Sequence, residues 1–131
     1  MYITLESDYA IRIITFLLRQ KERNDAKTIS ENTDVTLRFS LKILRKLVSG
    51  GIVRSYKGAS GGYEIATEEK EISLADVITL IEGEFCLSRC LKSEAACTHG
   101  ESCDCKVNHV FRELSDYVMD RLSKTTFDQL I

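Results

Sequence analysis

The sequence predicts a mainly α-helical fold that contains one small β-hairpin and ends in a long helix. Apolar residues recur at the three- and four-residue spacing of an amphipathic helix in several separate segments. Between residues 52 and 66, two short runs rich in strand-forming residues flank the glycine-rich sequence GASGG, a pattern typical of a hairpin. The chain has 131 residues, and 44% of them are hydrophobic, which is sufficient for one buried core.

The first predicted helix follows Thr4, whose side chain suits an N-cap, and extends to about Arg19. Glu6 and Asp8 lie in its first turns, where the helix dipole favours acidic residues. Its apolar stripe consists of Ala10, Ile13, Ile14 and Leu17. A short second helix is predicted over 27–33, followed by a tight turn. With the next helix, this arrangement predicts a helix-turn-helix.

A third helix is predicted after Thr36, which is a suitable N-cap, and ends at Gly50 and Gly51. At 100° per residue, one side of this helix is apolar and is predicted to face the core. That side consists of Leu37, Leu41, Leu44 and Val48. The other side consists of Arg38, Lys42, Arg45 and Ser49.

Positive charge is concentrated in this helix and the hairpin after it. The stretch 36–63 holds six basic residues and no acidic one, although the whole chain has a net charge of −2. A basic helix followed by a basic hairpin is typical of a recognition helix and wing that bind DNA. The alternative is a solvated basic surface. We expect DNA contacts from Thr36, Arg38, Phe39, Ser40, Lys42, Arg45, Arg54, Lys57, Ser60 and Gly61.

Two further helices are predicted after the hairpin. Ser73 and Asp76 form a capping signal for a helix that ends at Gly83, and Asp104 is a candidate cap for a last helix from Cys105 to about Ser123. The last helix has a heptad-like seam made of Val107, Val110, Phe111, Leu114, Tyr117, Val118 and Leu122. Such a seam predicts packing on a partner subunit, and the alternative is packing on its own domain.

All five cysteines lie between residues 86 and 105. The chain begins without a basic and apolar leader and has no apolar run of about 20 residues, so we expect a cytoplasmic protein that does not enter membranes. An odd number of cysteines in a reducing compartment indicates an iron-sulfur cluster, zinc or redox-active thiols rather than disulfides. The sequence lacks the motifs of nucleophilic, P-loop and zinc-dependent enzymes, and we expect no catalytic residues.

Several stretches in order along the chain, SDYAIRII, TISENTDVTLRFSLKILRKLVSGGIVRS, KGASGGYEIA and EISLADVITLIEG, resemble the Rrf-two family of bacterial winged-helix transcription regulators. The resemblance implies a homodimer whose C-terminal helices cross and whose winged helices bind a palindromic DNA operator, most simply as a repressor. It divides the chain into a DNA-binding domain at 1–83, a cysteine-bearing sensor loop at 84–105, and a dimerisation helix with its tail at 106–131.

The resemblance also implies an iron-sulfur cluster, of 2Fe-2S or 4Fe-4S type, held by three cysteines. They correspond to Cys90, Cys97 and Cys105, with Cys103 as a rival to Cys105. Asp8 matches the position from which some members supply a carboxylate to the partner subunit's cluster. Three residues after Cys105, where one type of member has a histidine, this chain has Asn108. The alternatives are a zinc-stabilised module and a cluster-free regulator controlled by a partner protein or by thiol oxidation.

Overall fold

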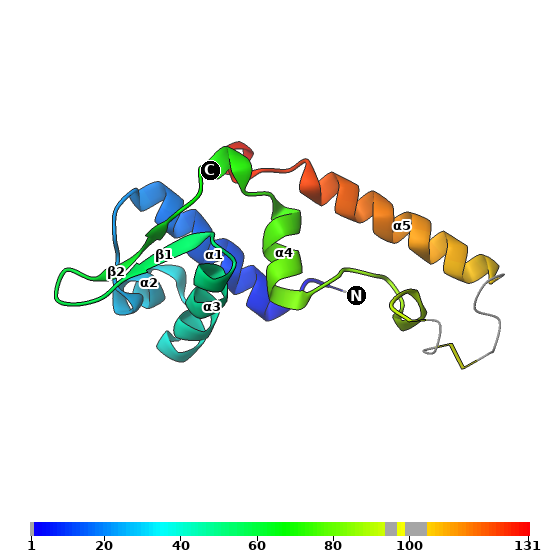
Figure 1. Ribbon diagram of the computed structural model, residues 1–131, viewed down its shortest axis with the longest axis horizontal. Helices are drawn as coiled ribbons and strands as arrows, with labels where there is room; N and C mark the ends of the chain where they lie inside the picture. The colour runs from blue at the N-terminus through cyan, green and yellow to red at the C-terminus, as the bar shows by residue number, and fades with distance from the viewer. Residues whose placement is uncertain (1, 94–96, 99–104) are drawn as a thin grey trace.

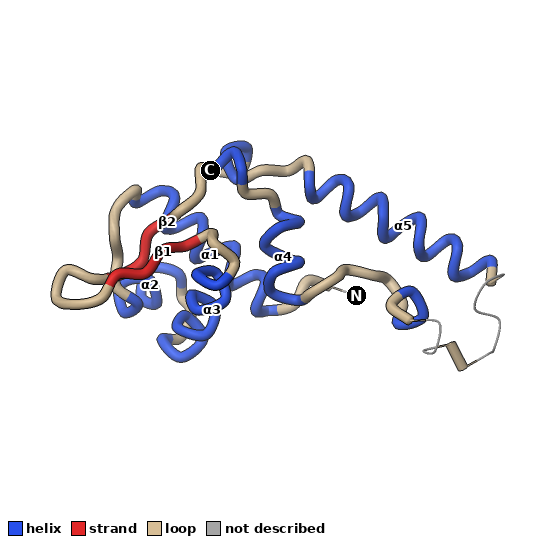
Figure 2. Tube along the Cα trace, viewed as in Figure 1, coloured by secondary structure: helices blue, strands red, loops and turns tan. Residues whose placement is uncertain are grey.

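The computed structural model describes residues 2–93, 97–98 and 105–131. The chain forms helices and one hairpin, as the sequence predicts (Figures 1 and 2). In order, the main elements are α1 (Leu5–Gln20), α2 (Ala26–Thr33), α3 (Leu37–Ser49), β1 (Val53–Tyr56), β2 (Gly62–Ile65), α4 (Leu74–Glu82) and α5 (Lys106–Ser123). Short 3-10 turns occur at η1 (Glu69–Glu71), η2 (Arg89–Leu91) and η4 (Phe127–Gln129). The predicted fold class is confirmed.

The helix starts follow the predicted capping residues closely. The hydroxyls of Thr4 and Thr36 accept hydrogen bonds from the first turns of α1 and α3, and Ser73 and Asp76 form a complete capping box at α4. α2 begins one residue earlier than predicted, because the side chain of Asp25 caps it. The capping role predicted for Asp104 lies outside the described residues.

The buried face of α3 is rotated from the predicted one. Its buried residues are Ser40, Ile43, Leu44 and Leu47, whereas Leu37 and Leu41 are 46% and 40% exposed. On a helical wheel, these two leucines both lie beyond the same edge of the buried arc, whose centre falls between Ser40 and Leu47. The prediction was therefore wrong for Leu37 and Leu41, but the basic residues do lie opposite the buried arc.

The wing is an antiparallel hairpin in which Val53 pairs with Ile65 and Tyr56 pairs with Gly62. Its second strand is tied to the turn between α1 and α2, because the backbones of Asn24 and Tyr63 exchange hydrogen bonds of 3.0 and 2.8 Å. Gly62 has φ +144°, and a Cβ there would lie 2.8 Å from the carbonyl oxygen of Asn24. Only glycine allows this approach. The wing is thus fixed at its base.

The core lies between α1, α2, α3 and α4, and the end of the chain completes it. Phe127 in η4 is fully buried, and its backbone N–H donates to the carbonyl of Ile72 at 3.0 Å. α5 instead projects away from the winged helix, at the opposite end of the molecule from the wing (Figure 1). In the described part of the chain, α5 buries only Asn108 and Ser115. No described helix has the length and apolar character to cross a bilayer.

Candidate nucleic-acid interface and cysteine segment

The exposed side of α3 presents cations around a shallow apolar hollow. Arg38, Lys42 and Arg45 are exposed along this side, over about two helical turns. The hollow is lined by Leu37, Arg38, Phe39, Leu41, Lys42 and Arg45. Cations around an apolar surface suit a duplex, since guanidinium and ammonium groups bind phosphates and base edges while apolar groups contact thymine methyls.

Three other predicted contact residues on this helix have structural partners. The Thr36 hydroxyl caps α3, and the Phe39 ring packs edge-on against Tyr9 with centroids 5.9 Å apart. Ser40 is fully buried, and its hydroxyl donates to the carbonyl of Val35 at 3.3 Å. Ser40 therefore faces the core in this structure, because it shares the buried arc with Ile43, and it offers no surface to DNA.

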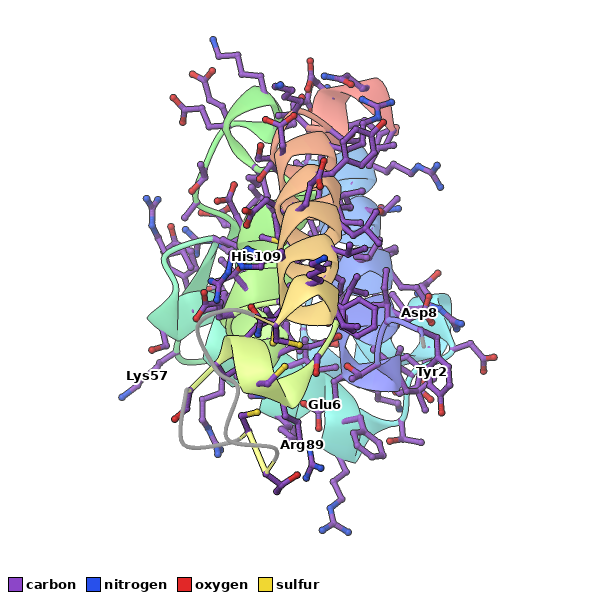
Figure 3. The ribbon with its side chains drawn as sticks, turned by 90° about the vertical axis from the view of Figure 1, so that its right-hand side faces the viewer. Tyr2, Glu6, Asp8, Lys57, Arg89 and His109 are labelled. Atoms are coloured by element: carbon purple, nitrogen blue, oxygen red, sulfur yellow. The ribbon has the colours of Figure 1, made fainter. Side chains whose placement is uncertain are left out.

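The wing brings further cations to the same end of the molecule. Arg54 is exposed on β1 and donates to the Tyr56 hydroxyl at 3.4 Å. Lys57 is exposed and points away from the body of the protein (Figure 3). Ser60 is exposed in the turn, whereas a Cβ at Gly61 would lie 2.4 Å from the Tyr56 carbonyl oxygen. Gly61 therefore serves the tight turn.

A polar cluster at the base of the wing was not predicted from the sequence. The guanidinium of Arg23 lies 3.3 Å from the centroid of the Tyr56 ring, and the Tyr56 hydroxyl donates to Glu64 at 2.6 Å. Arg23 also lies 3.8 Å from the Glu64 carboxylate. These contacts, together with the Asn24 bridge, hold the wing against the turn before α2.

A carboxylate from α1 reaches the cations of α3. Glu6 forms ion pairs with Lys42 and with Lys46, the latter at 3.1 Å, and Lys46 also donates to the carbonyl of Ile81 at 3.2 Å. Hydrogen bonds from Lys42 and then Lys46 hold the pKa of Glu6 below its ordinary value, so this carboxylate is ionised at neutral pH. Lys42, one of the predicted DNA contacts on α3, is thus already paired with a carboxylate of the same chain.

The other candidate carboxylate, Asp8, lies on the outside of α1. It pairs with Arg12 at 2.8 Å, and both side chains are nearly half exposed. Figure 3 labels Asp8. Within the described part of this chain, no cysteine joins it in a metal-binding group. Its exposed position leaves the carboxylate accessible to a second subunit.

The cysteines of the described segment are free thiols. Cys86, Cys90, Cys97 and Cys105 are all partly buried, and Cys103 lies outside the described residues. The Cys90 sulfur lies 3.2 Å from the Ser88 hydroxyl and 3.4 Å from the amide nitrogen of Asn108 on α5. Hydrogen bonds from Ser88 and then Asn108 lower the pKa of the Cys90 thiol. Thiolate is the form that binds metals and reacts with oxidants.

The donor set has the right chemistry for a soft metal centre. Thiolates suit both iron-sulfur clusters and zinc. Across residues 2–93, 97–98 and 105–131, no three side chains of histidine, cysteine, aspartate or glutamate come together as ligands. Asn108, at the start of α5, does approach Cys90, with its amide nitrogen 3.4 Å from the sulfur. The structure thus joins the start of α5 to the cysteine segment.

Comparison with known proteins gives the family. The model of the Rrf2 (Rrf-two) family, described as iron-dependent transcriptional regulators, matches residues 3–131. The chain belongs to the Rrf2 family. The predicted function class is therefore confirmed: the protein is a helix-turn-helix transcriptional regulator, and its relatives are regulators rather than enzymes.

Relatives and solved structures of this family agree with the fold. IscR of Pectobacterium atrosepticum is 30% identical over 103 residues, which are 79% of this chain and 61% of that protein. NsrR of Bacillus subtilis is 25% identical over 134 residues, covering 100% of this chain and 90% of that protein. The structure of CymR, the global cysteine regulator of Bacillus subtilis, superposes with a TM-score of 0.77 at 21% identity, over 99% of this chain and 95% of that one.

Proposed function

We propose that this Rrf2-family regulator binds a palindromic operator through α3 and the wing, and acts as a repressor. The observation that carries the proposal is the exposed cationic side of α3 beside a fixed basic wing. Arg38 lies in the first turn of α3, the part of a recognition helix that reaches base edges, whereas Lys57 on the projecting wing suits phosphate.

The proposal includes a homodimer formed through α5. Five large apolar side chains of this helix are 36% to 71% exposed: Val107, Val110, Phe111, Leu114 and Tyr117. An apolar face of this length on a helix that projects from the body fits a second copy of the same helix. Two half-sites about one DNA turn, ~34 Å, apart then receive one α3 from each subunit.

We propose further that the segment 84–105 senses iron-sulfur, redox or nitric-oxide status. Cys90, Cys97 and Cys105 would hold an iron-sulfur cluster, with Cys103 as the rival third thiolate and Asp8 of the other subunit as a possible further ligand. A bound cluster would supply a redox-sensitive, iron-based link between the segment and α5. The chain's own contribution is to stabilise one thiolate: Ser88 and Asn108 hydrogen-bond to Cys90 and lower the pKa of its thiol.

A cluster-free function is the second candidate, and the lowered pKa of the Cys90 thiol supports it as well. A thiol with a lowered pKa reacts with oxidants more readily than an ordinary one. Oxidation of Cys90 by a peroxide, which adds an oxygen atom to the sulfur and releases water or an alcohol, would replace the sulfur acceptor of the Asn108 hydrogen bond with a larger group and disturb the start of α5. A zinc-stabilised module is the third candidate.

The DNA-binding proposal is tested by replacing Arg38 and Lys57 separately with alanine. Loss of a base contact should reduce discrimination between a selected operator and mixed-sequence DNA by about 1–3 kcal/mol. Loss of a phosphate contact should weaken binding to both duplexes alike and reduce the salt slope by about 1. Undiminished discrimination by Arg38→Ala would refute the role of α3 in base recognition.

The cysteine proposal is tested by anaerobic purification, followed by an absorption spectrum and analysis of iron, sulfide and zinc. Cys97→Ala should abolish the cluster absorbance and change operator affinity while the dimer persists. Cys86→Ala is the matched control, because Cys86 precedes the proposed ligands, and it should retain the absorbance. A colourless, iron-free wild-type protein would exclude the cluster and leave the zinc or thiol alternatives, which the zinc content separates.

A further inference from the structure

The N-terminal turn of α1 places one carboxylate beside the proposed DNA-binding helix. Glu6 is 29% exposed and contacts the ammonium groups of Lys42 and Lys46, 36 and 40 residues further along the chain (Figure 3 labels Glu6). Its place is fixed by neighbouring contacts, since Glu82 of α4 accepts hydrogen bonds from the backbone and hydroxyl of Thr4 at 2.9 and 2.7 Å. The carboxylate is therefore held at the α3 surface.

The two lysines are held unequally. Lys46 is 37% exposed and has a second acceptor, the Ile81 carbonyl at 3.2 Å. Lys42 is 52% exposed, and Glu6 is its one acidic partner within the described residues. If Lys42 moves to another anion, Glu6 keeps its bond to Lys46 and is not left as an unpaired charge. Lys42 is thus the exchangeable member of the cluster.

We infer that Glu6 limits the DNA affinity of the α3 surface: it competes with DNA phosphates for the ammonium group of Lys42. The inference rests on the proposed DNA-binding role of α3. A phosphate that binds Lys42 must displace the carboxylate, and it must approach the negative charge that remains on Glu6.

This competition weakens non-specific binding and operator binding alike. Affinity for DNA of arbitrary sequence comes almost entirely from phosphate contacts and counterion release. Operator binding adds contacts to base edges, which the carboxylate on α1 leaves unaffected. Because Glu6 opposes the same phosphate contact in both modes, it lowers both affinities by the same factor, and a duplex without base contacts reports this effect most directly.

The test is the affinity of the full-length protein for a mixed-sequence duplex, measured over a range of salt concentrations. Glu6→Gln frees Lys42 and should raise this affinity about two- to fivefold at low salt, the range expected for one exposed ion pair. The slope of log affinity against log salt should steepen by up to about 0.9. Glu68→Gln is the matched control: it also removes one exposed carboxylate paired with a lysine, here Lys70 at 2.9 Å, and should leave the affinity unchanged.

A second comparison leaves Glu6 unchanged. It tests whether Glu6 competes with DNA for Lys42 even if the Glu6→Gln variant fails to fold. Within the described part of the chain, Arg45 has no carboxylate in ion-pair distance, whereas Lys42 has Glu6. Lys42→Met should therefore reduce mixed-sequence affinity less than Arg45→Met does. A loss as large for Lys42→Met as for Arg45→Met overturns the inference.

The remaining outcomes separate this inference from the proposed function. If Arg45→Met weakens binding but Glu6→Gln folds and does not strengthen it, Glu6 has a structural role only and the DNA-binding surface stands. An equal gain for Glu68→Gln attributes the effect to net charge and also overturns the inference. If Arg38→Met and Arg45→Met both leave binding unchanged, α3 is not the DNA-binding surface, and the proposed function fails with the inference.

Discussion

The helices α3 and α5 are both amphipathic, but α3 exposes its polar face whereas α5 exposes its apolar face. α3 buries Ile43, Leu44 and Leu47 in the core of its own chain and leaves its cations outside. α5 buries two polar residues, Asn108 and Ser115, and leaves large apolar side chains outside. An exposed cationic face suits a polyanion, whereas an exposed apolar face suits a protein surface. The proposed DNA-binding surface and the proposed subunit interface therefore lie on different helices.

The largest expected effect is on the dimer dissociation constant, when a charge is placed in the apolar face of α5. Leu114 is 47% exposed at the middle of this face. If the face is a dimer interface, Leu114→Glu buries an unpaired carboxylate there, and the dimer dissociation constant should rise about 30-fold or more. Light scattering should then give a mass near 14.8 kDa at micromolar concentration.

Glu113→Gln serves as the control for this variant. Glu113 is the exposed neighbour of Leu114 and lies off the apolar stripe, so its replacement should leave the mass of the wild type unchanged. A wild-type mass near that of one chain would show that α5 does not form the interface.

A smaller effect is expected from truncating a leucine beneath α3. Leu47 is fully buried, so Leu47→Ala should lower the free energy of unfolding by about 2–5 kcal/mol through the cavity that it leaves. Leu41→Ala is the matched control, because Leu41 is 40% exposed, and its effect should remain below about 1 kcal/mol. Urea denaturation measures both. Equal losses would mean that the two leucines share one buried stripe.

The leucines of α3 show which features of the structure can be predicted from the sequence and which cannot. The cap at Thr36, the cationic side of α3 and the capping box at Ser73 were predictable, because each depends on residues within a few positions of one another. The rotation of α3 about its axis was not, since it depends on which apolar residues the other helices cover. Leu41 and Leu44 are chemically identical, and only tertiary packing distinguishes them.

The contacts that modify the candidate sites are long-range in the same way. Glu6 meets Lys42 across 36 residues, and Asn108 meets Cys90 across 18. Periodicity carries no signal for such pairs. The acidic residue at the start of α1 is explained equally well by the helix dipole, which is the interpretation that the sequence favours. Phe127 likewise lies beyond the last helix, where no local pattern indicates that it completes the core.

The smallest expected effect is on the reactivity of the Cys90 thiol. It is caused by replacing Asn108, one of the two residues that α5 buries. The Asn108 amide donates to the Cys90 sulfur at 3.4 Å and, after Ser88, is the main cause of the lowered pKa of that thiol. Asn108→Ala removes this donor, so the thiolate is less stabilised and the pKa of Cys90 should rise. At a given pH, less thiolate is then present to react.

The measurement is the alkylation rate of Cys90 against pH in the reduced, metal-free protein, followed at the peptide level by mass spectrometry. In the wild type the rate should reach half its maximum at a lower pH than an ordinary thiol of pKa about 8.5 does. In Asn108→Ala the profile should move to higher pH, whereas Val107→Ala, on the exposed apolar face of the same turn, should leave it in place. Coincident profiles for wild type and Asn108→Ala would mean that the amide does not act on the thiolate, and that α5 contacts the cysteine segment through packing alone.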